Sequence, residues 1–284
     1  MTPVAGVVLA GGRSRRMGTP KAALEWHGST LLRRVTGIVA RAVDGPVLVV
    51  RSPAQPLPAL APDVRVLDDP REGLGPLQGL AVGLAAAATR PAGAAFVCST
   101  DMPFLHPAFV RRVVGGLHTG VDVAMPVAHG HPQPLAAVYR TALAADVARW
   151  LGGGERRLTV VAAHSRVALL GPNHLLADAA LAAADPELTS LHNLNRPADY
   201  RAARGRPAPL VTIYLRRHPT APAETLRLRA ATVAGVAGLL GSTTDEIIVG
   251  LDGATVVDGE TPLVDRDEIT VVGRWPPADE EGNA

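Results

Sequence analysis

The chain has 284 residues, of which 47% are hydrophobic and 19% charged, and its formal net charge is +2. This length is enough for two domains with buried cores, and so small a net charge argues against a nucleic-acid or membrane partner. A single cysteine, Cys98, excludes an intramolecular disulfide and fits a reducing compartment. No apolar run approaches the roughly 20 residues that cross a bilayer. No basic segment precedes the first apolar run, so we expect no signal peptide and a cytoplasmic location.

The first predicted element is an apolar strand over residues 4–10, followed by a basic, glycine-rich loop over residues 11–21. The adjacent residues Gly11 and Gly12 let backbone N–H groups point into one concavity, as in loops that bind phosphate oxygens. Lys21 is the only lysine among the 28 Lys and Arg residues, and lysine acts on phosphate as a compact point charge. The stretch therefore indicates phosphate binding, and its alternative is an ordinary strand-to-helix joint with a solvated loop.

Short apolar runs alternate with helix-like stretches along the first part of the chain. Strands are predicted over residues 4–10, 47–50, 64–67 and 94–98, and helices over residues 31–43 and 80–88. This alternation is typical of an α/β domain with a largely parallel sheet, in which ligands bind at the carboxyl ends of the strands. We therefore expect the loops that follow these strands, residues 11–21, 51–53, 68–79 and 99–105, to meet at one edge.

Asp101 is the strongest single candidate, because it lies just past a fully apolar strand. A carboxylate at that place can hold a Mg²⁺ ion that bridges phosphate oxygens. The alternative is an N-cap for a helix that begins near His106. Asp68 and Asp69 end the preceding predicted strand, where one can form a turn and the other can accept hydrogen bonds from a base or ribose.

Three further loops hold candidate residues. Gly75 and Gly79 flank a predicted helix entrance, where they suit either close approach of backbone to a ligand or a plain turn. Arg156 and Arg157 follow three glycines, a pattern suited to anion recognition. Asn193 and Asn195 precede a short helix, which they can cap, or they can reach the polar groups of a ligand. The pair His129 and His131 has no third ligand close in sequence, so we predict no metal site there.

Six motifs occur in one order over about residues 4–204: LAGGRSRRMG with Lys21, GPLQG, TDMP at Asp101, QPLAAVY, GERR and NLNRPADY. In this order and spacing they resemble the molybdenum cofactor guanylyltransferases, a branch of the sugar-nucleotide-transferase-like nucleotidyltransferases. The opening pattern is shared by the whole superfamily, and the last three motifs favour this branch. The resemblance implies a three-layer, Rossmann-like nucleotidyltransferase domain with a mostly parallel sheet over residues 1–204.

The resemblance also implies an activity, the Mg²⁺-dependent transfer of GMP from GTP to the phosphate of molybdopterin, with release of pyrophosphate. Such a transfer depends on positioning and charge neutralisation. The implied catalytic residues are Lys21, Asp101 and Arg16, with Asp101 as the metal ligand. The nucleotide is expected at Leu9, Ala10, Gly11, Gly12, Lys21, Arg51, Asp69, Gly75 and Gly79, with Asp69 on the guanine side. The pterin is expected at Arg156, Arg157, Asn193 and Asn195.

One residue departs from the family pattern: Arg51 stands where the family often has Asn, which bears on the choice of base. The alternatives are a cytidylyltransferase for the same pterin, a transferase for another phosphorylated metabolite, and a non-catalytic adaptor in cofactor assembly. The glycine loop, Lys21 and Asp101 together favour an enzyme over an adaptor, because a scaffold has no need of all three.

A second, smaller unit is predicted over residues 210–275, after a linker at residues 205–209. Its predicted elements are strands at 211–216 and 225–229, a helix at 232–240, and strands at 247–251 and 269–272, with a turn at Asp252-Gly253. This order resembles the ubiquitin-like (β-grasp) sulfur-carrier proteins, which end in Gly-Gly. The chain here ends in EEGNA, so we expect a docking or stabilising unit for other cofactor-assembly proteins, with disorder at residues 276–284.

Overall fold

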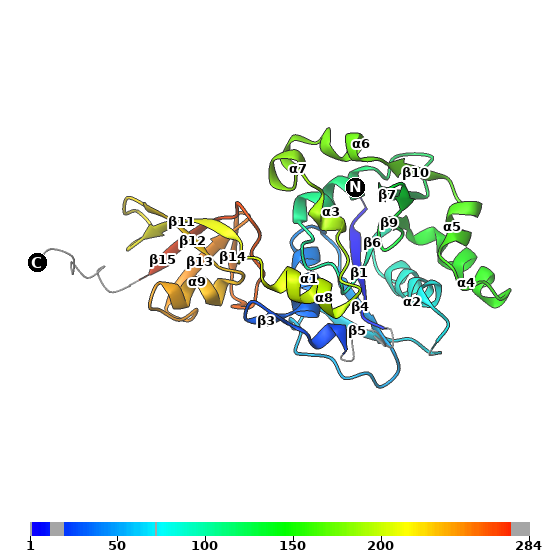
Figure 1. Ribbon diagram of the computed structural model, residues 1–284, viewed down its shortest axis with the longest axis horizontal. Helices are drawn as coiled ribbons and strands as arrows, with labels where there is room; N and C mark the ends of the chain where they lie inside the picture. The colour runs from blue at the N-terminus through cyan, green and yellow to red at the C-terminus, as the bar shows by residue number, and fades with distance from the viewer. Residues whose placement is uncertain (1, 12–19, 72, 274–284) are drawn as a thin grey trace, which may run out of the picture. The chain divides into compact units, whose positions relative to one another are not determined.

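The computed structural model describes residues 2–11, 20–71 and 73–273, which form two compact units. Unit 1 comprises Met1–Glu25 and Thr30–Ala203, and unit 2 comprises Trp26–Ser29 and Arg204–Ala284. Each unit has its own sheet and its own buried core (Figure 1). The α/β fold with a separate C-terminal sheet is thus confirmed, whereas the exact domain boundaries stay predictions and the tail at 276–284 lies outside the described residues.

The main sheet of unit 1 is built from strands β1 (Val4–Leu9), β4 (Val47–Arg51), β5 (Arg65–Asp68), β6 (Ala94–Ser99), β7 (Val123–Ala128), β8 (His131–Pro132), β9 (Ala136–Arg140) and β10 (Val167–Leu170). Its helices are α1 (Leu31–Ala40), α2 (Pro76–Ala88), α3 (Pro107–Gly115), α4 (Ala144–Gly152), α5 (Thr159–His164), α6 (Pro172–Leu176), α7 (Ala179–Ala184) and α8 (Pro197–Arg204). Short 3₁₀ helices occur at η1 (Lys21–Ala23), η2 (Thr141–Leu143) and η3 (Thr189–Leu191), and β2 (Glu25–Trp26) pairs with β3 (Ser29–Thr30).

The strand order of this sheet is β10-β7-β9-β6-β1-β4-β5, with β8 attached to β7. β1 pairs in parallel with both β4 and β6, and β4 pairs in parallel with β5. β9 runs antiparallel to both of its neighbours, β6 and β7. The four strands that carry the predicted ligand loops are therefore adjacent and point the same way.

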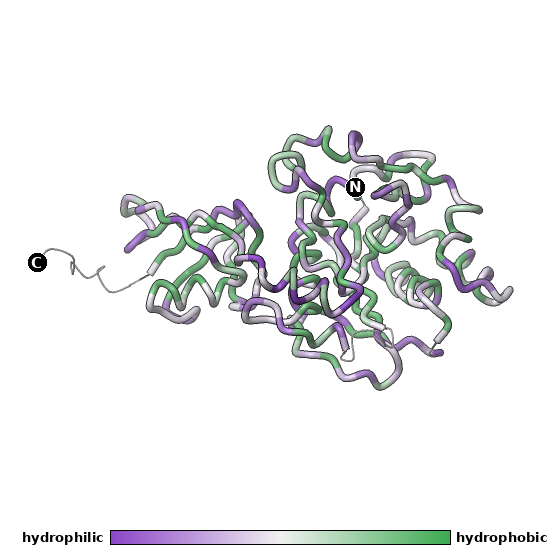
Figure 2. Tube along the Cα trace, in the orientation of Figure 1, coloured by the Kyte–Doolittle hydropathy of each residue, from purple (hydrophilic) through white to green (hydrophobic). Residues whose placement is uncertain are grey.

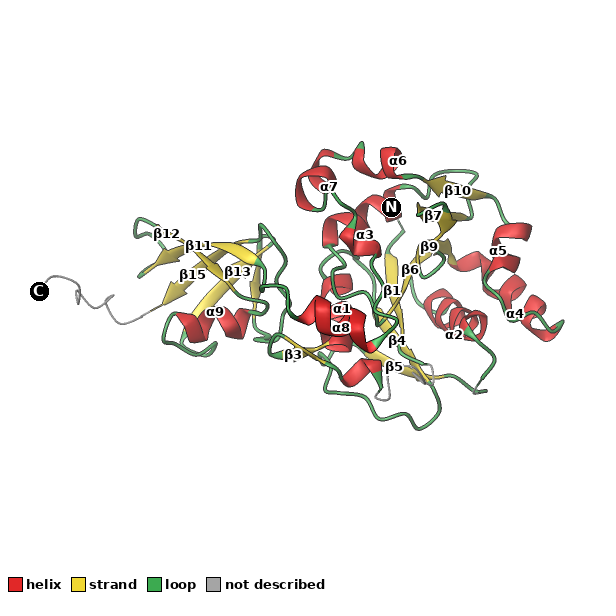
Figure 3. Ribbon diagram, in the orientation of Figure 1, coloured by secondary structure: helices red, strands yellow, loops and turns green. Residues whose placement is uncertain are grey.

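β1 lies at the centre of unit 1, with helices on both faces of the sheet (Figure 3). Two glycines allow this close packing: a Cβ on Gly6 would lie 2.3 Å from Val39 Cγ1 of α1, and one on Gly83 of α2 would lie 2.5 Å from Val7 Cγ1. Ala5, Val7 and Val8 are fully buried, and Figure 2 shows how hydrophobic residues concentrate in the central strands. Burial of apolar surface on both faces is typical of parallel sheets.

Two local expectations are corrected by the structure. Helix α2 begins at Pro76 and not at residue 80, because Pro at the first helical position already has the required φ; Gly79 therefore lies inside the helix. The cap of α3 is His106, whose side chain accepts a hydrogen bond from the N–H of Ala108 at 3.1 Å. The alternative that made Asp101 a helix cap is wrong.

Unit 2 contains β11 (Leu210–Arg216), β12 (Glu224–Arg229), α9 (Val233–Leu239), β13 (Ile247–Leu251), β14 (Ala254–Val256) and β15 (Glu268–Gly273), with strand order β12-β11-β15-β13-β14. β11 and β12, which contain the strands predicted over 211–216 and 225–229, pair antiparallel as a hairpin, and Thr232 caps α9 through its side chain. The relationship of this unit to sulfur-carrier proteins stays a prediction. No helix in the described ranges is long and apolar enough to span a membrane.

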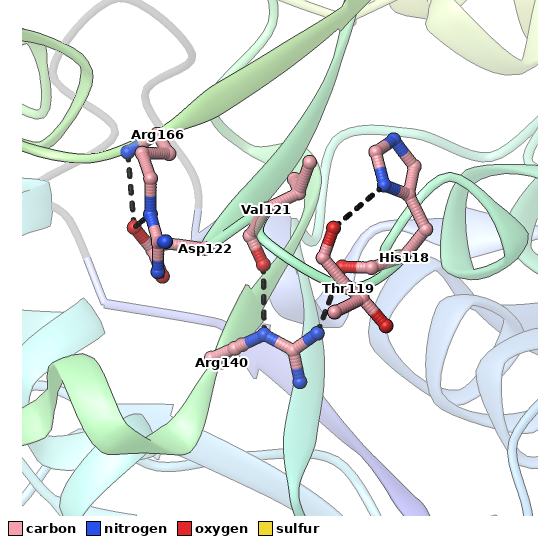
Figure 4. Close-up of polar contacts among 6 residues, drawn as sticks. All are labelled: His118, Thr119, Val121, Asp122, Arg140 and Arg166. Atoms are coloured by element: carbon pink, nitrogen blue, oxygen red, sulfur yellow. Dashed lines mark hydrogen bonds and ion pairs between the residues drawn. The ribbon is translucent and has the colours of Figure 1, made fainter.

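An ion pair ties β7 to β10 at the edge of the main sheet (Figure 4). The guanidinium of Arg166 donates to both carboxylate oxygens of Asp122, at 2.9 and 2.8 Å, and the Arg166 N–H adds a bond at 3.0 Å. Beside this pair, Arg140 donates to the carbonyls of Val121 and His118 at 2.7 and 2.9 Å. The hydrogen bonds from Arg166 lower the pKa of Asp122 from 3.8 to about 2.

We predict that Asp122→Asn lowers the melting temperature at neutral pH, and that this difference disappears in acid. A carboxyl whose pKa is lowered by folding adds stability above its unfolded pKa, and this stability is lost as the pH falls through the folded value. The gap between wild type and variant should be full above about pH 4 and close towards about pH 2. Thermal unfolding between pH 2 and 7 measures it. Asp63→Asn, an exposed site, is the control, and a gap that does not depend on pH would contradict the assignment.

Candidate functional site

The ends of β1, β4 and β6 are joined by hydrogen bonds to two carbonyls. The carbonyl of Leu9 accepts from the N–H and the hydroxyl of Thr100, at 3.3 and 3.1 Å. The carbonyl of Val50 accepts from the N–H groups of Ala10 and Gly11, at 2.8 and 3.2 Å. The loops that leave these three strands therefore start from fixed positions at one edge of the sheet.

A cavity of about 300 Å³ lies at this edge. Six of the predicted nucleotide-binding residues line it: Leu9, Gly11, Arg51, Asp69, Gly75 and Gly79. The other lining residues in the described part of the chain are Val50, Ser52, Gly73, Pro76, Ser99 and Leu135. Leu9, Val50, Pro76 and Leu135 make the walls partly apolar, and Arg51 and Asp69 provide charged groups. An apolar pocket with a few placed polar groups is typical of a small-molecule site.

Lys21 and Asp101 form an ion pair beside this cavity. Lys21 Nζ lies 2.7 Å from Asp101 Oδ2, and the two side chains are only 20% and 15% exposed. The other oxygen, Oδ1, accepts a hydrogen bond from Ser99 Oγ. Ser99 also lines the cavity, so this bond connects the carboxylate to the cavity wall. The two strongest catalytic candidates, which are 80 positions apart in sequence, are in direct contact.

The two charged residues of the cavity are each held by neighbouring groups. Arg51 ends β4 and donates through Nε to Asp68 Oδ1, its partner in register on β5, at 2.8 Å. The N–H of Asp69 donates to the Arg51 carbonyl at 2.8 Å, and Asp69 Oδ1 accepts from the Arg71 N–H at 3.0 Å. Of the two aspartates left open by the sequence, Asp68 supports Arg51 and Asp69 faces the cavity.

The loops predicted to bind the pterin approach the site from two sides. The carbonyl of Arg156 lies 3.2 Å from the place where a Cβ on Gly75 would be. The Arg156 guanidinium donates to the carbonyls of Leu151 and Glu155, at 2.9 and 2.7 Å, and Arg157 is exposed. The N–H of Leu194 donates to the Asp101 carbonyl at 2.9 Å, which places the segment with Asn193 and Asn195 next to Asp101.

Three of the nine predicted nucleotide-binding residues are not in the described lining: Ala10, Gly12 and Lys21. Gly12 and Arg16 lie outside the described residues. Ala10 is described but does not line the cavity. Its carbonyl accepts a hydrogen bond from Gln55 Nε2 at 3.0 Å. The roles of all the predicted site residues stay predictions, although the structure brings most of them to one edge.

Sequence reasoning missed two polar residues of the site. Ser99 stands two positions before Asp101, and that spacing at the end of a strand was the available signal. Gln55 lies in a proline-rich stretch, and nothing in its neighbourhood signals a side chain that reaches β1.

We predict that Gly75→Ala destabilises the protein by about 1–3 kcal/mol, because Gly75 has φ 79° and ψ −176°, a conformation almost confined to glycine. The new methyl group would also lie 3.2 Å from the Arg156 carbonyl, at the cavity wall. Chemical denaturation measures the loss. Gly238→Ala within α9 is the control, since nothing lies within 4 Å of the place that its new methyl group would take and alanine favours a helix. Equal stability of Gly75→Ala and wild type would contradict the strain.

Comparison with known proteins identifies the family. The sequence profile of the MobA-like NTP transferase domain matches residues 6–167. A protein of Mycobacterium tuberculosis strain H37Rv, named probable molybdenum cofactor guanylyltransferase, is 44% identical over 162 residues, which are 56% of this chain and 79% of that protein. One of the same name from Mycobacterium avium strain 104 is 38% identical over 204 residues, 70% of this chain and 94% of that protein.

A solved structure supports the same fold. Molybdopterin-guanine dinucleotide biosynthesis protein A from Archaeoglobus fulgidus superimposes with a TM-score of 0.56 at 23% identity, covering 71% of this chain and 97% of that chain. The family profile covers more than half of the sequence, and both mycobacterial relatives are matched over most of their length. The chain therefore belongs to the MobA-like NTP transferase domain family and is a nucleotidyltransferase.

Proposed function

We propose that this protein transfers GMP from GTP to the terminal phosphate of molybdopterin. In this reaction a phosphate oxygen of the pterin forms a bond to the α-phosphorus of GTP, and the bond from that phosphorus to the bridging oxygen breaks. The products are a dinucleotide cofactor and pyrophosphate. The names of the mycobacterial relatives support the choice of both substrates.

The observation that carries the proposal is the Lys21–Asp101 ion pair beside the cavity. A nucleotide in the cavity would place its base between the apolar walls and its phosphates toward Gly11 and Lys21. Phosphoryl chemistry of this kind needs charge neutralisation and alignment more than covalent help from the protein. Lys21 supplies positive charge for the phosphates, and Asp101, at the same edge of the sheet, supplies a carboxylate that can hold a cation.

Separate tasks are proposed for the residues in and beside the cavity. Lys21 neutralises phosphate charge as the nucleotide binds, because its ammonium is a compact donor on a flexible stem. Asp69, with one carboxylate oxygen already held by the Arg71 N–H, offers the other to base N–H groups. The N–H of Leu194 fixes the Asp101 backbone, and the adjoining Asn193 and Asn195 are assigned to the pterin side.

A divalent cation fits the donor chemistry of Asp101. Mg²⁺ prefers carboxylate oxygens and is commonly bound by one or two of them together with water and substrate phosphates. The described residues hold no cluster of three His, Cys, Asp or Glu side chains, so phosphates and water would complete the coordination. We assign Mg²⁺ to Asp101, where it would supply charge stabilisation for the phosphates.

We predict that Lys21→Ala and Asp101→Asn each lower the turnover of GTP by about 100-fold or more, the loss typical when one charge-stabilising group is removed. Pyrophosphate release with GTP, Mg²⁺ and molybdopterin measures it. Asp146→Asn is the matched control, because it breaks an exposed ion pair with Arg149 on α4. Full activity in both site variants would contradict the proposed chemistry, and transfer from CTP in place of GTP would change the assigned base.

We also predict that GTP binding becomes tighter when Mg²⁺ is added, and that Asp101→Asn removes this increase. The physical reason is that an ion held by both the carboxylate and the phosphates couples their binding. Titration of the full chain with GTP, in EDTA and then in excess Mg²⁺, measures the coupling without any turnover. An undiminished Mg²⁺ effect in Asp101→Asn would exclude Asp101 as the ligand.

A further inference from the structure

Gln55 connects three parts of the nucleotide edge. Its side-chain Nε2 donates to the Ala10 carbonyl at 3.0 Å, and its Oε1 accepts from the Ser52 N–H at 3.2 Å. Its backbone carbonyl accepts from Arg51 Nη1 at 2.9 Å, and its N–H donates to the Ser52 carbonyl at 3.0 Å. One half-buried residue thus ties the end of β1 to the loop after β4 and to the guanidinium of Arg51.

The guanidinium of Arg51 is consequently held at two of its three nitrogens, by Asp68 at Nε and by Gln55 at Nη1. Within the described ranges no hydrogen bond joins Nη2 to the protein. Arg51 lines the cavity, and its side chain is 29% exposed. An arginine fixed in this way presents its remaining N–H groups in a set direction, which is the requirement for reading a hydrogen-bond pattern.

We propose that Arg51 is the residue that reads the O6 and N7 acceptors of guanine, and that Gln55 is the positioning residue that aims it. Guanine is the base whose O6 and N7 acceptors match the fork of an arginine, the commonest specific arginine-to-base contact. Adenine places an amino group at position 6, so a fixed donor would meet a donor. Asp69 faces the same cavity with a carboxylate, which suits the N1–H and amino group on the other edge of guanine.

This inference rests on the proposed function, because it takes GTP as the nucleotide. It adds a base contact for Arg51 and a positioning role for Gln55, which the sequence alone does not indicate. The presence of an arginine at position 51 leaves the choice of base open. The contacts with Asp68 and Gln55 bear on that choice, because these two protein acceptors take up part of the donor capacity of Arg51 and fix the plane of its guanidinium.

The experiment measures binding of GTP, 7-deaza-GTP and inosine triphosphate to the full chain by calorimetric titration. 7-Deaza-GTP lacks only the N7 acceptor, and inosine triphosphate lacks only the 2-amino group. We expect the wild type to prefer GTP over 7-deaza-GTP by about tenfold, the effect of one hydrogen bond to a charged group. In Arg51→Met this preference should fall to about one, while the preference for GTP over inosine triphosphate persists, because it reports on the opposite edge.

Gln55→Leu tests the positioning role, because it removes the two side-chain bonds that hold residue 55, and with it the backbone carbonyl that accepts from Arg51, while Arg51 itself is unchanged. The preference for GTP over 7-deaza-GTP should fall to about two- to threefold, which is a change in selectivity that a general loss of structure does not produce. Arg65→Met, at an exposed arginine on β5, is the matched control and should keep the wild-type ratio. Thermal unfolding verifies that each variant is folded.

The outcomes separate this inference from the proposed function. An unchanged ratio in Arg51→Met, with GTP still bound, overturns the base contact and leaves guanylyl transfer standing. A lowered ratio in Arg51→Met with an unchanged ratio in Gln55→Leu overturns the positioning role. Failure of the wild type to bind GTP overturns both, and loss of both preferences in Arg51→Met would show a collapsed pocket and contradict an edge-specific contact.

Discussion

Two backbone carbonyls, those of Leu9 and Val50, set the geometry on which the site depends. Each accepts two donors from a neighbouring strand end or from the loop that leaves β1. Because β1 is buried on both faces and pairs in parallel with β4 and β6, its end cannot shift without disturbing the core. The loops therefore start from a buried part of unit 1 that is paired on both sides, and side chains far apart in sequence meet there.

The Lys21–Asp101 pair has a positional role more than a stabilising one. Ion pairs that are partly exposed to solvent contribute about 0–1 kcal/mol to folding. The value of this pair lies in placing a flexible ammonium next to a carboxylate that also accepts a hydrogen bond from Ser99, while the Leu194 N–H holds the backbone carbonyl of the same aspartate. A nucleotide that arrives with several negative charges can compete for the ammonium with little loss of stability in the fold.

Strands, caps and turns that follow from local sequence patterns could be predicted, whereas side-chain contacts between residues far apart in the sequence could not. The apolar runs located the strands around Gly11, Arg51, Asp69 and Asp101, and parallel topology then implied that their loops meet. In unit 2, Thr232 and the turn at Asp252-Gly253 were also predictable, because capping and positive φ (53° and 79°) follow from residue type. Gln55 was not, since its side chain bonds to Ala10, 45 positions away in sequence.

The same distinction applies to the base selectivity that we propose, because it depends on residues that carry no recognisable motif. A free arginine loses up to about 2 kcal/mol of side-chain entropy when it is ordered by a ligand. Asp68 and Gln55 order Arg51 before any ligand arrives, so that loss occurs during folding and the binding energy of the base contact is retained. The proposed choice of base thus depends on the neighbours that hold the side chain at position 51, Asp68 and Gln55.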